Sequence, residues 1–174
     1  MNRILVGICL GAGTLAACVE SGAERDPGRE ESVVTGSGID EVERLAKSWR
    51  WSRRVVLASG SETALSEQAG LVGDDWERWR ERDMELVLLT RGGGLVVERF
   101  VDDGPIGPTF DAAVEAAFEA RFGIDPDGDG FQAVLVGKDG GVKARWNELV
   151  VPAAVFELVD AMPMRIREMR EDER

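Results

Sequence analysis

The stretch "FQAVLVGKDGGVKARW", residues 131–146, carries the clearest local pattern in the chain. Its first part is a short apolar run that is typical of a buried strand. Lys138-Asp139-Gly140-Gly141 follows and contains the Asp-Gly pair that favours a tight hairpin turn. Residues 142–146 can then pair back on the first strand. The stretch therefore predicts a β-hairpin.

A helix is expected after this hairpin. Pro152 suits the first turn of a helix, because a proline lacks the N–H that would be unpaired there. The residues expected to face inward are Val155, Leu158, Val159 and Met162. Pro163 interrupts the helix, and "MRIREMREDER", residues 164–174, is expected to form a charged helical tail.

Two further buried strands are predicted upstream, at Arg54–Ala58 and Met84–Thr90, since both are continuous apolar runs. A helical stretch, residues 61–82, lies between them, with Ser61 as its N-cap. Gly70 and Gly73 predict a kink or break in it. One face of this stretch repeats apolar side chains at intervals of 4, 3, 4 and 3, namely Leu65, Ala69, Val72, Trp76 and Trp79.

Other elements fill the rest of the chain. A short helix is expected before the first strand, with Ile39, Val42, Ala46 and Trp49 on one side. Residues 95–100 can form a hairpin partner for the strand at 84–90, and residues 104–108 read as a loop. Thr109 is expected to cap a helix over residues 110–122, whose inner face carries Val114, Phe118 and Phe122.

The expected order is β-α-β(β)-α-β-β-α, which indicates the α/β class. A βαβ start that ends in helix, hairpin and helix is the thioredoxin layout. We therefore predict a thioredoxin-like domain over residues 39–174. Its central mixed β-sheet would have four to five strands, with helices on both faces.

The amino terminus is typical of an exported protein. Arg3 precedes an uncharged apolar run, residues 4–17, which as a helix would span about 21 Å and fall short of a bilayer core of roughly 30 Å. We interpret residues 1–17 as a signal peptide. Leu15-Ala16-Ala17-Cys18 resembles the lipobox of bacterial lipoproteins, which implies cleavage after Ala17 and lipid attachment to Cys18. An ordinary secretory signal cleaved nearby is the alternative.

Residues 18–38 are rich in Glu, Ser, Gly and Arg, and we interpret them as the lipidated cysteine followed by a flexible acidic tether. Two or three acyl chains hold a protein stably on a membrane. The expected location is the cell envelope, with the membrane as a partner through the anchor. Val19 after the cysteine implies the outer membrane facing the periplasm if the host is Gram-negative.

The composition excludes several functions. A net charge of −12 repels phosphate backbones and anionic lipid headgroups, so nucleic acid is not an expected partner. The chain has no histidine, which removes Ser-His-Asp and Cys-His catalysis and every histidine-based metal site. Cys9 would leave with the signal peptide and Cys18 would be lipidated, so no thiol would remain free.

Three segments resemble one bacterial family, catalogued as domain of unknown function 4174. They are Trp51-Ser-Arg-Arg-Val-Val-Leu57, Val136-Gly-Lys-Asp-Gly-Gly-Val-Lys143, and Asp160-Ala-Met-Pro-Met-Arg165 with Arg167-Glu-Met-Arg170. The resemblance covers about residues 49–170. It implies a thioredoxin- or peroxiredoxin-like fold, related to domains of extracellular sushi-repeat proteins. It supplies no established active site.

The residues at the expected redox position do not fit thiol chemistry. In the thioredoxin layout the working cysteine follows the first strand, where the next helix begins and stabilises a thiolate. Residues 58–63 read "ASGSET" and contain no cysteine. Gly130 stands where such folds usually place a cis-proline, and the nearest proline is Pro126. Ser59 and Ser61 have no histidine to activate them, although a lysine base is conceivable.

An acidic loop raises the question of calcium. Asp125, Asp127 and Asp129 match the first half of an EF-hand loop, but the twelfth position is Val136, where calcium needs a carboxylate. Asp102 and Asp103 could help only if the fold brings them close. We interpret the loop as a turn, because Asp and Gly favour turns, and expect no metal or cofactor.

Three functions follow from these observations. The first is a membrane-tethered, non-catalytic thioredoxin-like module that binds a protein or another envelope component. The second is an enzyme, either a redox protein that borrows a partner's thiol or a hydrolase that uses Ser59 or Ser61. The third is a calcium-stabilised structural module.

Overall fold

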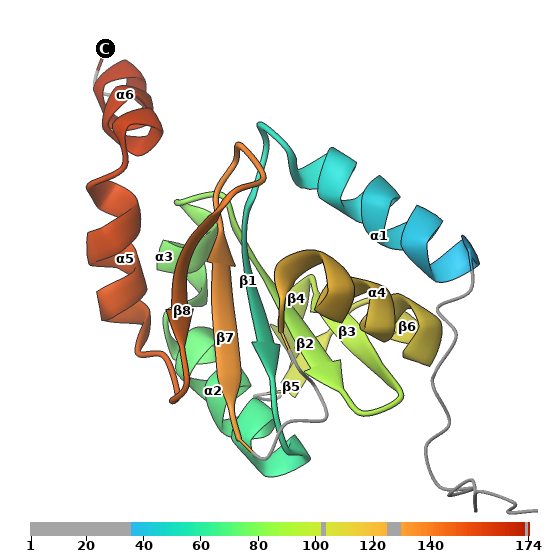
Figure 1. Cartoon of the computed structure of the whole chain (residues 1–174). Coiled ribbons are helices and arrows are strands. Elements are labelled where there is room, and N and C mark those ends of the chain that lie inside the picture. Colours follow the sequence, from blue (N-terminus) through green and yellow to red (C-terminus); the bar gives the residue numbers. More distant parts are fainter. Residues whose placement is uncertain (1–35, 102–103, 125–129, 173) are drawn as a thin grey trace, which may run out of the picture. The chain divides into compact units, whose positions relative to one another are not determined.

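The computed structural model describes residues 36–101, 104–124, 130–172 and 174, all within one compact unit. A six-stranded mixed sheet forms its centre, in the order β6-β3-β2-β1-β7-β8 (Figure 1). The strands of this sheet are β1 (Arg54–Ser59), β2 (Met84–Thr90), β3 (Gly93–Val97), β6 (Thr109–Asp111), β7 (Gln132–Val136) and β8 (Val142–Trp146). A separate two-stranded ribbon consists of β4 (Arg99–Val101) and β5 (Gly104–Ile106).

Strand β1 lies between β2 and β7 and is buried along its whole length, as its continuous apolar sequence requires. It pairs in parallel with β2, from Arg54 opposite Met84 to Ser59 opposite Leu89, and antiparallel with β7 on its other side. A parallel neighbour requires a crossover connection, which the helices between β1 and β2 supply. The two strands predicted from apolar runs at 54–58 and 84–90 are confirmed.

The hairpin predicted at residues 131–146 is also confirmed, as β7 and β8. Gly140 has a φ of 82°, in the left-handed region that glycine adopts without strain. The Gly140 N–H donates to the Gly137 carbonyl oxygen at 2.8 Å, and the Asp139 carboxylate accepts from the Gly141 N–H at 3.0 Å. Local turn chemistry therefore fixes this part of the sheet.

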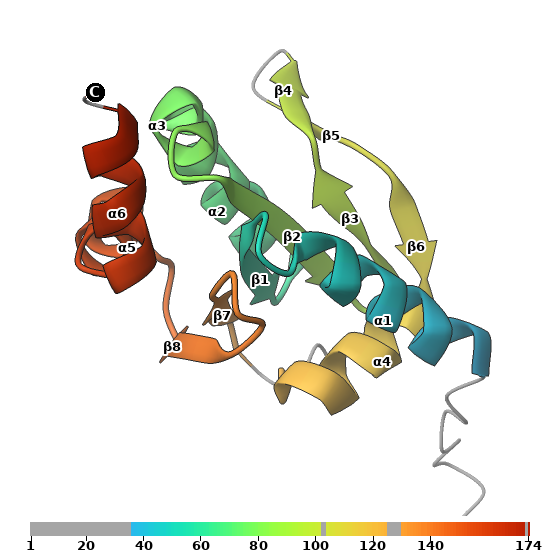
Figure 2. The same cartoon turned by 90° about the horizontal axis from the view of Figure 1, so that it is seen from above.

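The helices cover both faces of the sheet (Figure 2). On one face lie α1 (Gly36–Trp49) and α4 (Ala112–Phe122), packed over a core that includes Val55, Leu57 and Phe118. The other face carries α2 (Glu62–Asp74), α3 (Trp76–Arg80) and α5 (Pro152–Asp160) over a second core around Val56, Leu86 and Leu135. A last helix, α6 (Pro163–Asp172), follows α5.

The α/β class, the mixed sheet and the helices on both faces are confirmed, and the arrangement is compatible with a thioredoxin-like fold. The sheet has six strands, one more than expected, because Thr109–Asp111 forms the edge strand β6. Asp111 caps α4 in place of Thr109, since its carboxylate accepts from the N–H groups of Ala113 and Val114.

Several details of the expected elements were wrong. The loop predicted at 104–108 contains β5, and the partner strand predicted at 95–100 is divided between β3 and β4. Leu158 was expected to face inward but is exposed, and Ile39, expected on the same side of its helix as Val42 and Trp49, is exposed whereas those two are buried. The break predicted near Gly70 and Gly73 is confirmed, since the helical stretch 61–82 is divided after Asp74 into α2 and α3.

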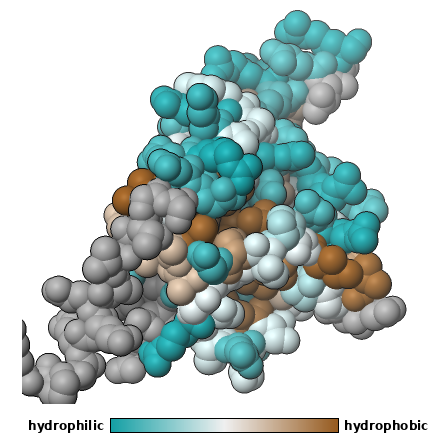
Figure 3. Space-filling model, turned by 90° about the vertical axis from the view of Figure 1, so that its right-hand side faces the viewer, coloured by the Kyte–Doolittle hydropathy of each residue, from teal (hydrophilic) through white to brown (hydrophobic). Residues whose placement is uncertain are grey.

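One side of the molecule is shown in Figure 3, with hydrophilic residues over its upper part and smaller apolar areas below.

Among the described residues, the helices are all too short or too polar to cross a bilayer.

Candidate functional site

The carboxyl end of β1 is the place where a thioredoxin-like sheet presents its reactive group, and here it carries serines. Ser59 is the last residue of β1 and is completely buried; its hydroxyl has no hydrogen-bond partner among the described residues. Ser61 is the N-cap of α2, as predicted, and its hydroxyl accepts from the Ala64 N–H at 3.2 Å. Burial removes Ser59 from contact with a substrate, and capping occupies the Ser61 oxygen. The two serines therefore have structural roles, Ser59 in the buried strand and Ser61 as a helix cap.

A groove of about 490 Å³ lies beside this position, between the first half of α2 and the end of the sheet that β3 and β6 form. Its walls are largely apolar. The apolar side chains that line it are Leu65, Ala69, Leu88, Leu95, Pro105 and Phe110. Glu62, Ser66 and Thr90 supply a small number of polar groups at its margin. An apolar concave surface with few polar groups is typical of a binding site. We name it the α2 groove.

Two glycines shape the strand side of the α2 groove. A Cβ atom at Gly94 would collide with the Phe110 ring and the Leu88 carbonyl oxygen, and one at Gly93 would collide with the Phe110 backbone. Only glycine lets β6 lie this close to β3 at these positions. The "RGGG" sequence, residues 91–94, therefore both connects β2 to β3 and allows the close approach of β6.

The opposite, amino end of β1 holds a cluster of charged side chains. Arg54 is only 1% exposed; it donates to both carboxylate oxygens of Glu168, at 3.0 and 3.2 Å, and to the Arg82 carbonyl oxygen at 2.8 Å. Lys138, also buried, donates to Glu168 at 2.7 Å and to Asp83 at 2.8 Å. Burial alone would raise the pKa of Glu168, but the hydrogen bonds from Lys138 and Arg54 outweigh it, so this pKa is lowered.

The cluster continues along α5 and α6. Arg82 donates two hydrogen bonds to the Asp160 carboxylate, at 3.0 and 2.7 Å, and its guanidinium lies 4.4 Å from the centre of the Phe156 ring. Arg165 lies within 4 Å of both Asp160 and Glu168. We name this group the amino-edge cluster. Its members are Arg54, Arg82, Asp83, Lys138, Asp160, Arg165 and Glu168.

The amino-edge cluster brings together the three sequence segments that carry the family resemblance. The first segment supplies Arg54, the second supplies Lys138, and the third supplies Asp160, Arg165 and Glu168. Their charges are paired with one another. These motifs therefore hold α6 against the start of the sheet.

Some of the predicted site residues fall outside the described part of the chain. These are Cys18, the pair Asp102 and Asp103, and the loop acids Asp125, Asp127 and Asp129. Within the described ranges there is no group of three or more His, Cys, Asp or Glu side chains that could hold a metal ion. The expected redox position, residues 58–63, runs from the carboxyl end of β1 into the first turn of α2, as expected.

Sequence reasoning missed both the α2 groove and the amino-edge cluster. A signal for the cluster was present, because an arginine begins a strand that is otherwise apolar, and a buried arginine requires a carboxylate partner. The groove has no comparable signal, since it depends on how β3, β6 and the β4–β5 ribbon lie against α2.

Comparison with known proteins gives one result that concerns the family. Residues 45–168 match a family described as "Domain of unknown function (DUF4174)". No curated protein and no solved structure matches the chain. The matched range covers most of the chain and includes the residues through which the three segments meet in the amino-edge cluster. The protein therefore belongs to the family of domain of unknown function 4174.

Proposed function

We propose that the protein is an exported lipoprotein, anchored in the cell envelope through Cys18, whose α/β domain is a non-catalytic binding module. The α2 groove is the proposed binding site. It would take an extended, predominantly apolar segment of an envelope protein. The observation that carries this proposal is an apolar groove next to the carboxyl end of β1, where Ser59 is buried and Ser61 caps α2.

The position of the groove supports binding as its role. In open α/β sheets, ligands bind outside the carboxyl ends of the strands. Leu88 and Thr90 are at the end of β2, and Glu62 is in the first turn of α2, where the helix begins after β1. The groove therefore occupies the place where this kind of sheet offers a ligand site.

The chemistry of the lining supports an apolar partner. Leucine and alanine side chains release water when they are covered, at roughly 25 cal/mol for each Å² of apolar surface buried. Gly93 and Gly94 contribute backbone to the groove, because Phe110 fills the space where their side chains would lie. The few polar groups at the margin can orient the peptide.

The anchor is supported by the sequence alone. Leu15-Ala16-Ala17-Cys18 ends an uncharged run, as a lipobox requires. Growth with labelled palmitate should label the wild-type protein, and Cys18→Ser should remove both the label and the attachment to membranes. An unlabelled wild-type protein would contradict the anchor and leave the groove proposal to its own test.

The groove is tested by filling it. Ser66 is exposed and lines the groove, so Ser66→Trp should block a partner without disturbing the core. Proteins crosslinked to the wild type in the native envelope are compared with those crosslinked to the variant. Ala154→Trp, at an exposed position on α5, is the matched control. We expect the proteins that crosslink to the wild type to be lost from Ser66→Trp and kept by Ala154→Trp. The same set of crosslinked proteins in the wild type and both variants would contradict the proposal.

A further inference from the structure

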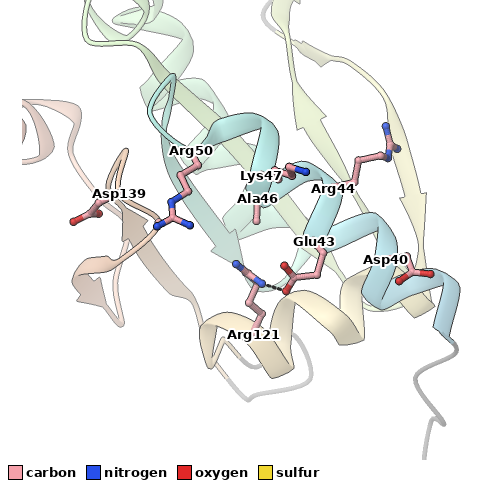
Figure 4. A pocket seen from close by; sticks show the side chains of 9 residues that line it. Asp40, Glu43, Arg44, Ala46, Lys47, Arg50, Arg121 and Asp139 are labelled. Carbon is pink, nitrogen blue, oxygen red and sulfur yellow. Dashed lines mark hydrogen bonds and ion pairs between the residues drawn. The ribbon is translucent and has the colours of Figure 1, made fainter.

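A second hollow, of about 720 Å³, lies between α1, α4 and the turn of the β7–β8 hairpin (Figure 4). Arg50, directly after α1, and Arg121, on α4, both point into it. Asp139, on the hairpin turn, also lines it. It shares no residue with the α2 groove and no side chain with the amino-edge cluster.

The sequence beside this hollow is basic in a strongly acidic chain. Arg44, Lys47, Arg50 and Arg53 recur at every third residue, and no Asp or Glu occurs between the first and the last of them. The net charge of −12 therefore describes the average surface and not this segment. The repulsion of anionic headgroups expected from that net charge does not apply locally, because salt screens charges beyond about 10 Å.

Among the described residues, two of these four cations have no counter-charge. Arg44 and Arg53 are each paired with a carboxylate. Lys47 and Arg50 form no ion pair within the described ranges, and the Arg50 guanidinium instead lies 5.6 Å from the centre of the Trp51 ring. Unpaired cations at the wall of a hollow can accept an external anion.

The carboxylates of the hollow are already engaged. Asp139 accepts from the Lys143 ammonium at 2.6 Å, and this hydrogen bond lowers the pKa of Asp139. Glu43 is paired with Arg121. Asp40, the remaining carboxylate of the wall, lies toward the opposite end of α1 from Arg50 (Figure 4). The part of the hollow near Arg50 therefore presents positive charge.

An exposed tryptophan adjoins these cations. Trp51 is 62% exposed, although its backbone is fixed by a 2.6 Å hydrogen bond from its N–H to the Lys138 carbonyl oxygen. A large aromatic side chain in water is unfavourable, and tryptophan beside basic residues is typical of a surface at the membrane–water interface. The position of Trp51 therefore favours a lipid surface over a free small anion.

We propose that this surface, defined as Arg44, Lys47, Arg50, Trp51 and Arg121, binds phospholipid headgroups, with one phosphate between Arg50 and Arg121. The guanidinium fork matches the geometry of phosphate oxygens. Arg50 reaches the hollow from the residue after α1 and Arg121 from α4, and Arg121 has further N–H groups besides the one paired with Glu43. The inference rests on the proposed anchor: α1 is the first described element after Cys18, and the intervening residues span at most about 65 Å. We name it the α1 basic surface.

The test uses the full lipidated protein, reconstituted into vesicles. A nitroxide label at Ser48→Cys, exposed on α1, reports contact with the bilayer, and one at Thr63→Cys, exposed on α2, is the reference. Accessibility of each label to a water-soluble relaxation agent is measured in phosphatidylcholine vesicles with and without phosphatidylglycerol. We expect the Ser48→Cys label to be protected when phosphatidylglycerol is present, and Thr63→Cys to remain accessible.

Charge reversal then identifies the residues. Arg50→Glu and Lys47→Glu should each reduce the protected fraction about fivefold or more, since a basic residue near an anionic surface contributes that much to binding. Arg170→Glu, exposed on α6, changes the net charge equally and should have no effect. Unchanged thermal unfolding of Arg50→Glu verifies that its fold is intact.

The possible failures are distinguishable. Protein that does not remain on vesicles, or that is labelled at Cys18, contradicts the anchor. Protein that remains but shows no protection at Ser48→Cys, or equal protection in phosphatidylcholine alone, overturns the α1 basic surface. Binding of inorganic phosphate that Arg50→Glu abolishes, together with a Ser48→Cys label that stays accessible on phosphatidylglycerol vesicles, would assign the hollow to a free anion and overturn the assignment to lipid.

Discussion

Polar groups have different surroundings at the two ends of β1. At the amino end, Arg54 and Lys138 are buried, and their charges are neutralised by carboxylates from distant parts of the chain. At the carboxyl end, Ser61 is used as a helix cap, and the neighbouring surface is an apolar groove. The charges at the amino end are therefore paired within the chain, whereas the carboxyl end carries the proposed binding surface. The family motifs contribute to the fold, and the proposed binding surface lies at the opposite edge of the sheet.

The largest effect is expected from breaking the amino-edge cluster. Glu168→Gln removes the charge that Arg54 and Lys138 share, and a buried cation without its partner is costly. Because Asp83 still bonds Lys138, we expect a loss of about 3 kcal/mol in the free energy of unfolding, at the lower end for such pairs. Urea unfolding followed by tryptophan fluorescence measures it. Glu171→Gln, exposed on the same helix, should change it by less than about 0.5 kcal/mol.

Acid should reproduce this loss in the wild type. The pKa of Glu168 is lowered in the folded protein, so the stabilisation is complete above the ordinary glutamate pKa of roughly 4.3. It disappears as the pH falls through the lower, folded-state pKa. The difference in unfolding free energy between wild type and Glu168→Gln should therefore be constant from pH 5 to pH 7 and shrink below about pH 4. If the difference in unfolding free energy stays constant down to pH 3, the effect of Glu168→Gln comes from lost packing and not from the lost charge.

Helix α2, which begins after the carboxyl end of β1, makes a buried polar contact that provides a smaller test. Gln68 on α2 donates to the Val150 carbonyl oxygen at 3.0 Å and accepts from the Val150 N–H at 2.7 Å. Gln68→Leu leaves both backbone groups unpaired, and we expect a loss of about 2 kcal/mol in the free energy of unfolding. Glu67→Leu, exposed at the next position, should be near neutral. Equal losses of stability in Gln68→Leu and Glu67→Leu would show that the Gln68–Val150 contact does not hold α2 to the start of α5.

The smallest effect is expected at Ser61. Ser61→Ala removes the N-cap of α2 and should cost about 1 kcal/mol, whereas Ser61→Asp should retain most of the stability, since aspartate also caps helices. Thermal unfolding measures both, with Ser66→Ala as the control. Crosslinking of partners should survive in both variants. Loss of partners from Ser61→Ala at unchanged stability would give this hydroxyl a binding role.

The parts of the fold that the sequence predicted are those controlled by neighbouring residues. The β7–β8 hairpin follows from an Asp-Gly turn between apolar runs, and β1 and β2 follow from continuous apolar stretches. The three-residue strands β4, β5 and β6 were missed because so short a strand has no periodicity of its own. Their pairing depends on residues elsewhere in the chain.

The candidate sites were less predictable for the same reason. The serines at the carboxyl edge were placed correctly, because their position follows from the end of β1 and the start of α2. The tail at residues 164–174 was expected only to be charged and helical. Which of its charges is paired depends on the distance to Arg54, and spacing along the helix does not reveal that distance.

The contact between α6 and β1 has a consequence for how the protein is made. Arg54 and Glu168 are 114 positions apart, so the central strand receives its counter-charge only after nearly the whole chain has been synthesised and, if exported, translocated. Contacts this distant in sequence form late and slow the folding of small domains. A chain cut short by proteolysis or a premature stop before Glu168 would contain a guanidinium that it can neither bury nor neutralise. The last helix thereby distinguishes finished molecules from incomplete ones, and only the finished molecules would escape the proteases that remove unfolded chains.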